Sequence, residues 1–349
     1  MSPEGSSNAA PSVEGVRLLA HRPSVLFKLE RFGSQAEDAD VSVEGVLISG
    51  PGWSERLRDV MSTLSSAERA LLFAVRLDDR SGLPLAATTL LDRDRTHWFP
   101  KFLSQGQLTP VFQPLVDLGD GSVFGREALI RGRMGKVELR GRELLEAAEV
   151  HDAIFSFDAR TRARCLEVGL ARLPEGETLL VKLDPRAVLD IDSSVRGVWP
   201  LVESCGGEVG ENCSLGLELM GAQRHADLGM LCELVAAHRE YGAIISLDDI
   251  SAGTDAITVL EALRPEVAKL PLHLCKAIEA SPARRHLVGA LVEVAHELNC
   301  RVVAVGIERD SELEHVQELG IDLGQGFFLG QPSEEMLPVD GRLAARSLT

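Results

Sequence analysis

The sequence predicts an α/β protein made of a closed (β/α) barrel and a smaller N-terminal domain of α/β or α+β type. From Trp98 onward, apolar runs typical of strands alternate with segments of helical periodicity. Repeated strand–helix units form a parallel sheet covered by helices. The 349 residues leave room for one TIM-like barrel of about 250 residues and a second domain of about a hundred. We place the small domain at 14–96 and the barrel at 97–340.

Short segments flank these two domains. Residues 1–13 are rich in Ser, Pro, Ala and Gly, without the basic start and apolar core of a signal peptide, and are expected to form a disordered tail. Residues 341–349 form a C-terminal tail. The longest apolar stretches, such as 70–75, fall far short of the roughly 20 residues that cross a bilayer. We therefore expect a cytoplasmic protein that does not contact membranes.

The small domain shows short, mixed patterns, and its residues do not indicate a role. We expect strands at Val25–Phe27, Val43–Ile48, Leu71–Leu77 and Pro84–Leu91. A helix with Ser54 as its N-cap should lie between the second and third of these strands. Its apolar residues recur at helical spacing and are Leu57, Val60, Met61 and Leu64.

The barrel is predicted from six strands and the helices between them. The expected strands are Val123–Ile130, Thr178–Leu183, Ser214–Leu219, Ala243–Leu247, Val267–Leu270 and Arg301–Ala304. The expected helices include Phe155–Gly169, His225–Tyr241 and Pro282–Leu298. In such a barrel the carboxyl ends of the strands open at one mouth, where active sites lie. The residues expected at this mouth are Glu127, Lys182, Asp184, Glu218, Asp248, Asp249, Lys269 and Val305.

Charge and cysteine content exclude some classes of function. A net charge of −17 and a pI near 5.0 repel phosphates at long range, so we expect no nucleic-acid partner. The six cysteines show neither a Cys-x-x-Cys pair nor zinc-like spacing, and we expect them to be reduced and mostly buried. A small anionic ligand remains compatible with a locally basic or metal-filled pocket.

Four of the expected mouth residues are carboxylates, namely Glu127, Glu218, Asp248 and Asp249. Two unit charges about 4 Å apart repel by roughly 4 kcal/mol at an effective dielectric of about 20, so such a cluster needs cations. Mg²⁺ and Mn²⁺ prefer oxygen ligands, and a pair of such ions can generate a hydroxide and stabilise a reacting phosphodiester. Taken singly, each acid is also consistent with a solvated loop or a helix cap.

An ordered series of fragments connects these residues with a known family. The fragments are Gln113-Pro114, Glu127-Ala128-Leu129, Leu217-Glu218-Leu219, Leu247-Asp248-Asp249, Ala268-Lys269-Leu270, Ala304-Val305-Gly306-Ile307-Glu308 and Gln325-Gly326. In this order the chain resembles the EAL domain family, which hydrolyses cyclic di-GMP with divalent metals. The resemblance implies a TIM-like barrel of the EAL type.

The resemblance also implies roles for individual residues. Glu127 and Lys269 match catalytic positions, and the four mouth carboxylates match metal-binding ones. Six residues match positions that line the nucleotide groove, namely Gln113, Pro114, Leu129, Arg131, Gln325 and Phe327. Arg131 offers a planar fork suited to a phosphate, and Phe327 offers a ring that can stack on a guanine.

Two positions at the mouth depart from the family pattern. Lys182 stands where the family has a metal-binding Asn, and Val305 stands where it has a metal-site Glu. An ammonium cannot bind a metal, but it can bond neighbouring carboxylates as a tethered substitute for an ion. The alternatives are that Lys182 points outward and that Glu308 has turned inward to replace the lost carboxylate. The loop that starts at Asp248-Asp249 and the Met220-Gly221 segment are altered as well.

We therefore expect a degenerate EAL protein that is catalytically impaired and needs no cofactor. It should act as a cyclic di-GMP receptor or as a protein-binding module, with a protein partner and with a homodimer as a further expectation. The alternative is a weak phosphodiesterase that uses Mg²⁺ or Mn²⁺ and gives the linear dinucleotide.

Overall fold

The structure is a computed structural model that describes residues 14–20, 22–33, 39–42, 45–79, 81–210, 214–225, 227–250 and 253–339. The chain divides into two compact units, Met1–Lys101 with Glu146–Asp152, and Phe102–Leu145 with Ala153–Thr349. The tails expected at 1–13 and 341–349 lie outside the described residues. Among the described residues, every helix is too short or too polar to span a lipid bilayer.

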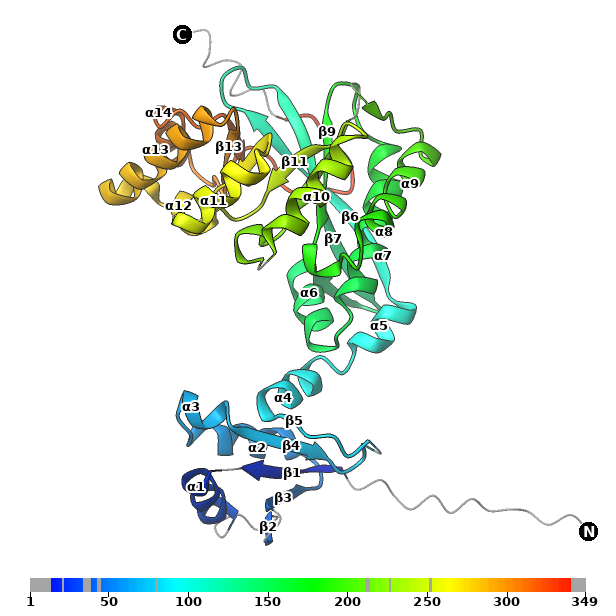
Figure 1. The fold of residues 1–349 in the computed structure, drawn as a ribbon, viewed down its shortest axis with the longest axis vertical. Coiled ribbons are helices and arrows are strands. Elements are labelled where there is room, and N and C mark those ends of the chain that lie inside the picture. Colours follow the sequence, from blue (N-terminus) through cyan, green and yellow to red (C-terminus); the bar gives the residue numbers. More distant parts are fainter. Residues whose placement is uncertain are drawn as a thin grey trace, which may run out of the picture. The chain divides into compact units, whose positions relative to one another are not determined.

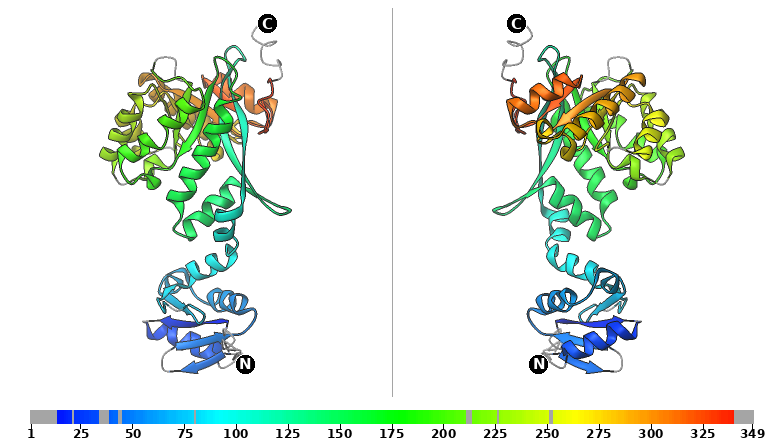
Figure 2. Two further views of the ribbon diagram at one scale, coloured as in Figure 1. Left: turned by 90° about the vertical axis from the view of Figure 1, so that its right-hand side faces the viewer. Right: turned by 90° about the vertical axis from the view of Figure 1, so that its left-hand side faces the viewer.

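The first unit contains an antiparallel sheet in the order β2-β3-β1-β4-β5 (Figures 1 and 2). Its strands are β1 (Gly15–Ala20), β2 (Ala39–Ser42), β3 (Gly45–Ser49), β4 (Leu72–Arg76) and β5 (Leu85–Ala86). Its helices are α1 (Pro23–Gly33), α2 (Trp53–Ser62), α3 (Ser66–Arg69) and α4 (Ala87–Arg95). Because β3 is inserted between β1 and β2, which α1 connects, this is a split β-α-β arrangement. Of the two classes expected, the small domain is therefore α+β.

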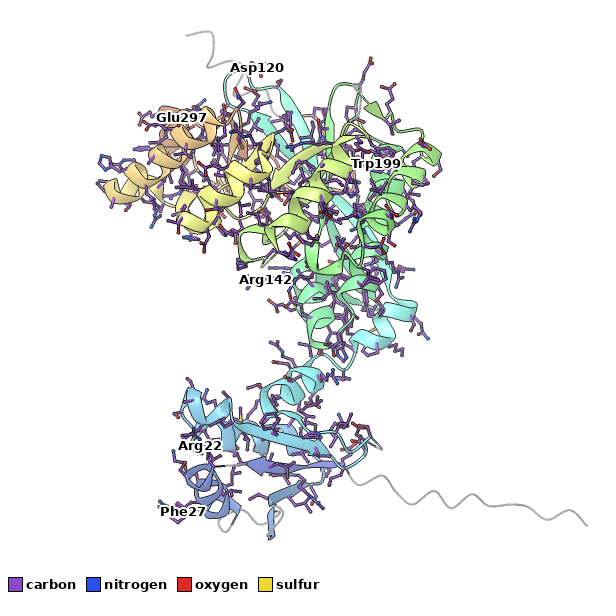
Figure 3. The ribbon with its side chains drawn as sticks, in the orientation of Figure 1. Arg22, Phe27, Asp120, Arg142, Trp199 and Glu297 are labelled. Atoms are coloured by element: carbon purple, nitrogen blue, oxygen red, sulfur yellow. The ribbon has the colours of Figure 1, made fainter. Side chains whose placement is uncertain are left out.

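The prediction of a strand at Val25–Phe27 is wrong, because these residues lie in helix α1. Val25 and Leu29 are buried one helical turn apart. Phe27 is 66% exposed and points away from that buried face (Figure 3). Three successive apolar residues looked like a strand, but only the residues at helical spacing enter the core.

Two other expectations for this unit also need correction. The predicted helix forms as α2, but its N-cap position is Gly52, in the left-handed region at φ 75°, and Ser54 lies inside the helix. Of the predicted strand Pro84–Leu91 only β5 forms, because α4 begins at Ala87 and buries one face. The predicted strand Leu71–Leu77 is confirmed by β4, and the described part of Val43–Ile48 is confirmed by β3, while Val43 and Glu44 lie outside the described residues.

A closed barrel of eight strands forms the second unit (Figure 1). The strands are β6 (Gln107–Asp117), β7 (Val123–Met134), β9 (Thr178–Leu183), β10 (Leu215–Leu219), β11 (Ile244–Leu247), β12 (Val267–Lys269), β13 (Arg301–Val305) and β14 (Leu323–Gln325). β7 and the strands from β9 to β14 are parallel neighbours in sequence order. The TIM-like barrel and its six predicted strands are confirmed.

Strand β6 departs from a fully parallel barrel, since it runs antiparallel to both β7 and β14. The connection at 118–122 is short and makes β6 and β7 a hairpin, whereas parallel neighbours need a longer crossover. A further strand, β8 (Val137–Arg140), pairs with the end of β7 outside the ring.

Helices alternate with the barrel strands and cover the outside of the barrel (Figure 2). They are α7 (Ile154–Leu170), α8 (Ile191–Arg196), α9 (Trp199–Ser204), α10 (Leu228–Arg239), α11 (Thr254–Leu263), α12 (Leu272–Cys275), α13 (Pro282–Glu297) and α14 (Asp310–Glu318). α5 (Phe99–Gln105) precedes β6, and α6 (Gly141–Val150) follows β8. The three predicted helices are confirmed by α7, α10 and α13.

Alternation along the strands decides which side chains face the inside of the barrel. Leu115, Leu180, Val267, Val303 and Leu323 form a cluster of their own within the barrel, separate from the larger core that includes the covering helices. Because side chains on a strand point to opposite faces in turn, residues two positions further on also face inward. The inward residues placed in this way at the carboxyl ends are Lys182, Lys269, Val305 and Gln325.

Candidate functional site

A network of ion pairs fills the mouth of the barrel. The ammonium nitrogen of Lys182 lies 2.8 Å from Glu127 Oε1, 2.6 Å from Glu218 Oε1 and 3.3 Å from Asp248 Oδ2. These carboxylates come from β7, from β10 and from the position after β11. The alternative that Lys182 points outward is therefore wrong: its ammonium group bonds three carboxylates at once, as the ion-substitute hypothesis expects.

Lys269 binds the other oxygens of the same two glutamates. Its ammonium nitrogen lies 2.7 Å from Glu127 Oε2 and 2.6 Å from Glu218 Oε2. Only 1% of the Lys269 side chain is exposed, against 30% for Lys182. The amide of Gln325 donates a further hydrogen bond to Glu127 Oε2 at 2.8 Å. The two lysines and two glutamates thus form a closed ring of alternating charge.

The network raises the pKa values of both lysines and shifts those of the two glutamates in opposite directions. Burial lowers the pKa of both Lys182 and Lys269, but the facing carboxylates outweigh burial and leave both values above their ordinary range. Burial likewise raises the pKa of Glu127, yet the two ammonium groups hold it well below its usual value. For the fully buried Glu218, burial and the charge of Glu127 raise the pKa to about 7. Both lysines are therefore charged at neutral pH.

Asp249, Val305 and Glu308 do not join this network. The Asp249 side chain is 51% exposed and lies 3.9 Å from Arg224. Val305 packs against the apolar cluster inside the barrel and offers no lone pair. Glu308 is 46% exposed and pairs with Lys276 at 3.2 Å, so it has not turned inward to replace a carboxylate.

The six residues expected to line a nucleotide groove separate into different environments. Leu129 and Arg131 line a cavity of about 410 Å³ next to Lys182. Gln113 donates a hydrogen bond to the carbonyl of Gly330 at 3.1 Å, and Pro114 packs against the same glycine. The amide of Gln325 is turned to Glu127. Phe327 is 59% exposed.

Most of the residues that line the cavity beside Leu129 and Arg131 are not predicted from the sequence. Its walls come from β7, β9, α6 and α7, and its cationic side chains besides Arg131 and Lys182 are Arg140, Arg142 and Arg162. Arg140 is the register partner of Arg131 on β8. Burial lowers the pKa of Arg131, and the neighbouring charge of Arg140 lowers it further. The cavity therefore brings five cationic side chains together, beside the carboxylates of Asp158 and Asp184.

The buried pair of Asp158 and Arg162 connects this cavity with the loop after β9. The two residues are spaced i, i+4 on α7 and form an ion pair, and Asp158 Oδ1 accepts a hydrogen bond from the Asp184 amide at 3.2 Å. Asp184, which the sequence placed at the mouth, bonds Arg186 with both carboxylate oxygens. The i, i+4 spacing of opposite charges was the signal in the sequence that could have revealed this contact.

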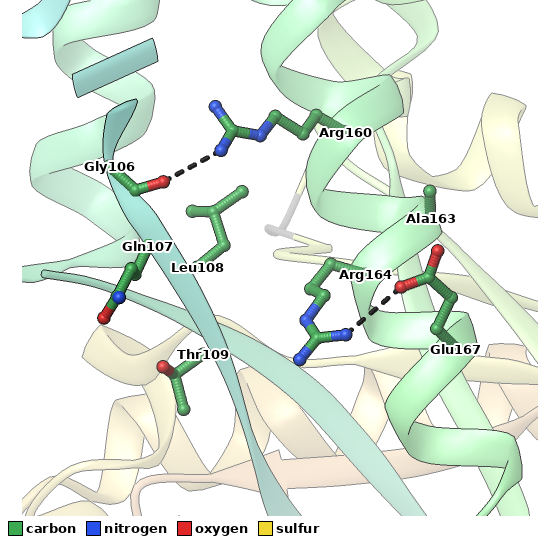
Figure 4. Close-up of a pocket in the computed structure, with 8 residues that line it drawn as sticks. All are labelled: Gly106, Gln107, Leu108, Thr109, Arg160, Ala163, Arg164 and Glu167. Atoms are coloured by element: carbon green, nitrogen blue, oxygen red, sulfur yellow. Dashed lines mark hydrogen bonds and ion pairs between the residues drawn. The ribbon is translucent and has the colours of Figure 1, made fainter. Parts of the chain in front are cut away.

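A second hollow, of about 560 Å³, lies between the start of β6 and α7 (Figure 4). Arg160 donates a hydrogen bond to the Gly106 carbonyl at 2.8 Å, and Arg164 pairs with Glu167 at 3.2 Å. None of the site residues expected from the sequence lines it.

The side chains at the mouth do not fit a divalent metal ion in this arrangement. All four carboxylate oxygens of Glu127 and Glu218 are within 2.8 Å of an ammonium nitrogen, and ammonium groups repel cations. Across the described ranges, no group of three or more His, Cys, Asp or Glu side chains is placed to hold a metal.

Comparisons with known proteins agree with this architecture. The EAL domain model matches residues 97–332. The chain is 28% identical over 233 residues to the cyclic di-GMP phosphodiesterase NbdA of Pseudomonas aeruginosa, a match that covers 66% of this chain and 29% of that protein. It is 22% identical over 237 residues to the probable cyclic di-GMP phosphodiesterase PdeG of Escherichia coli, with 66% and 45% covered. The chain thus matches less than half the length of these relatives.

Solved structures share the barrel fold. A standalone EAL protein from Vibrio cholerae in its c-di-GMP bound form matches with a TM-score of 0.58 and 22% identity. The match covers 68% of this chain and 98% of that protein. The FimX EAL domain of Xanthomonas citri in complex with c-diGMP has a TM-score of 0.61 and 18% identity, with 71% and 98% covered. The family model, which spans most of the barrel unit, shows that this chain belongs to the EAL domain family.

Proposed function

We propose that this protein is a regulatory member of the EAL family that binds cyclic di-GMP without hydrolysing it and acts on a protein partner. The observation that carries the proposal is the Lys182 ammonium held by three carboxylates at the mouth. In a metal-dependent phosphodiesterase these carboxylates would hold cations that activate water. Here two lysines supply the positive charge, and a lysine cannot generate a metal-bound hydroxide.

The ligand is proposed from the cavity beside the mouth and from the relatives. Arg131 is the planar donor suited to a phosphate, and Arg140 and Arg142 add charge near it. Apolar walls from Leu129 and Phe157 suit the flat face of a base. Two structures of the same fold contain cyclic di-GMP, which makes this dinucleotide the first ligand to test.

The second candidate function is a weak phosphodiesterase that uses Mg²⁺ or Mn²⁺. Two observations favour it: Glu127 and Lys269 are still in contact at 2.7 Å, and the curated relatives are named as phosphodiesterases. The candidate requires Lys182 to leave its three partners before an ion could enter. That requirement makes it the weaker of the two.

Calorimetric titration of the intact protein with cyclic di-GMP tests the receptor proposal. We expect the same affinity with Mg²⁺ and with EDTA, because both mouth cations are side chains. Arg131→Ala should weaken binding roughly ten- to a hundredfold, since a hydrogen bond to a charged group contributes about 1.5 to 3 kcal/mol. The matched control is Arg133→Ala, two residues further along β7, where the arginine is 58% exposed and pairs with Glu138.

A flat titration at millimolar ligand would remove the receptor function. The proposal would then reduce to a module that binds protein, which affinity capture with the intact chain can examine. Equal losses from Arg131→Ala and Arg133→Ala would show that general charge, and not the cavity, attracts the ligand. A sedimentation measurement on the same samples would address the proposed homodimer.

A further inference from the structure

The position of the Lys182 ammonium within the mouth resembles that of a bound cation. It is surrounded by oxygens from Glu127, Glu218 and Asp248 at 2.6 to 3.3 Å. Carboxylate oxygens of this number and charge are what hard divalent ions take as ligands. Lys182 is also the outer of the two lysines, with 30% of its side chain exposed, whereas Lys269 is sealed beneath it at 1%. An ion that entered from solvent would therefore meet Lys182 first.

We propose that Lys182 is a built-in cation that holds the mouth together and keeps divalent ions out, and that a neutral residue at this position would open a divalent-ion site. The inference rests on the proposed loss of metal-dependent hydrolysis, for which it supplies the physical cause. The ion selectivity of the mouth is a separate property, because a measurement of nucleotide binding alone does not reveal it.

The charge balance favours this assignment over a purely structural ion pair. With both lysines present, three carboxylates face two ammonium groups, so the residual charge of the mouth is small. Removal of Lys182 leaves Lys269 as the only facing ammonium among these contacts, so the mouth carries a double negative charge when all three carboxylates are ionised. One divalent ion would neutralise that charge, and Coulomb attraction in a partly buried site is strong. While Lys182 is present, an ion has to displace a group that is already tethered in place.

The substitution Lys182→Asn provides the sharpest test, because it removes the ammonium and adds a carbonyl oxygen that can bind a metal. Mn²⁺ is titrated calorimetrically into wild type and variant in the absence of nucleotide, and thermal unfolding is followed with Mn²⁺ and with EDTA. We expect wild type to show little binding and an unchanged Tm. The variant should bind Mn²⁺ at least about ten times more tightly, and its Tm should rise when the ion is added, because the ion binds the native state.

Lys276→Asn is the matched control, since Lys276 also pairs with a glutamate but lies on the exposed surface. It should behave as wild type toward Mn²⁺. If Lys182→Asn unfolds in EDTA, Mn²⁺ should restore the folded state, and failure of the ion to do so would overturn the proposal. A folded Lys182→Asn variant without gain in Mn²⁺ affinity would overturn it as well, as would tight Mn²⁺ binding by wild type.

This outcome is distinguishable from failure of the proposed function. The selectivity of the mouth is measured without nucleotide, whereas the receptor function is measured with wild type in EDTA. A variant that gains Mn²⁺ affinity while wild type does not bind cyclic di-GMP would support the role of Lys182 and remove the receptor. If wild type binds cyclic di-GMP but the Lys182→Asn variant gains no Mn²⁺ affinity, the receptor function is supported and the proposed role of Lys182 is removed.

Discussion

Replacement of Lys269 by methionine is expected to lower the free energy of unfolding by about 3 to 5 kcal/mol, because it leaves the buried carboxylates of Glu127 and Glu218 with one facing ammonium in place of two. Lys269 is the more deeply buried of the two mouth lysines, and its ammonium bonds Glu127 and Glu218 at 2.7 and 2.6 Å. Methionine keeps much of the side-chain volume, so the loss reports charge more than packing. Urea denaturation of wild type and variant, followed by circular dichroism, gives the value.

The control for this prediction is Lys276→Met. Lys276 pairs with Glu308 at 3.2 Å, and both side chains are about half exposed, so the loss should lie between about 0 and 1 kcal/mol. Similar losses from the two substitutions would contradict the idea that the ring of lysines and glutamates organises the barrel mouth.

The second large effect concerns catalysis. With Mg²⁺ or Mn²⁺, the purified protein is expected to leave cyclic di-GMP intact on the timescale of ordinary enzymes, which turn over at about 1 s⁻¹ or faster. Loss of one preorganised electrostatic element commonly lowers a rate by roughly 10² to 10³. Here Val305 offers no metal ligand, and Lys182 occupies the space among three carboxylates. Chromatographic detection of the linear dinucleotide measures the rate.

Turnover near 1 s⁻¹ that disappears in a Glu127→Ala variant would refute this prediction. The Glu127→Ala protein serves as the control, because activity that persists in it belongs to a contaminating nuclease. A slow, metal-dependent rate that Glu127→Ala abolishes would instead support the second candidate function.

The sequence predicted the barrel more completely than the small domain for a physical reason. Barrel strands buried on both faces are continuous apolar runs, such as β9, and they separate clearly from amphipathic helices. Strand β6 was not predicted because it contains Pro110 and Pro114, and proline is rare in a central strand. Strand β14 has only three residues, too few for any periodicity. In α1, the run at Val25 concealed the helical spacing of the buried residues.

The candidate site was also predicted only in part. Glu127, Lys182, Glu218, Asp248 and Lys269 meet as expected, because the ends of parallel strands converge at one mouth. The conformation of a single loop residue is not encoded in strand periodicity, and Asp249, at φ 62°, turns away toward Arg224.

The cavity beside the mouth was missed for a different reason. Its walls bring together β7, α6 and α7. These segments carry no shared pattern that would place Arg140 or Phe157 beside Leu129.

The ring of lysines and glutamates also bears on how the protein matures. Both of its positive charges are covalently part of the chain, and each is held by at least two carboxylates. Such charges cannot be lost to a chelator, exchanged for a competing ion, or left out when an ion is scarce. The mouth should therefore be complete as soon as the chain has folded, with no metal-loading step between synthesis and the first encounter with a ligand.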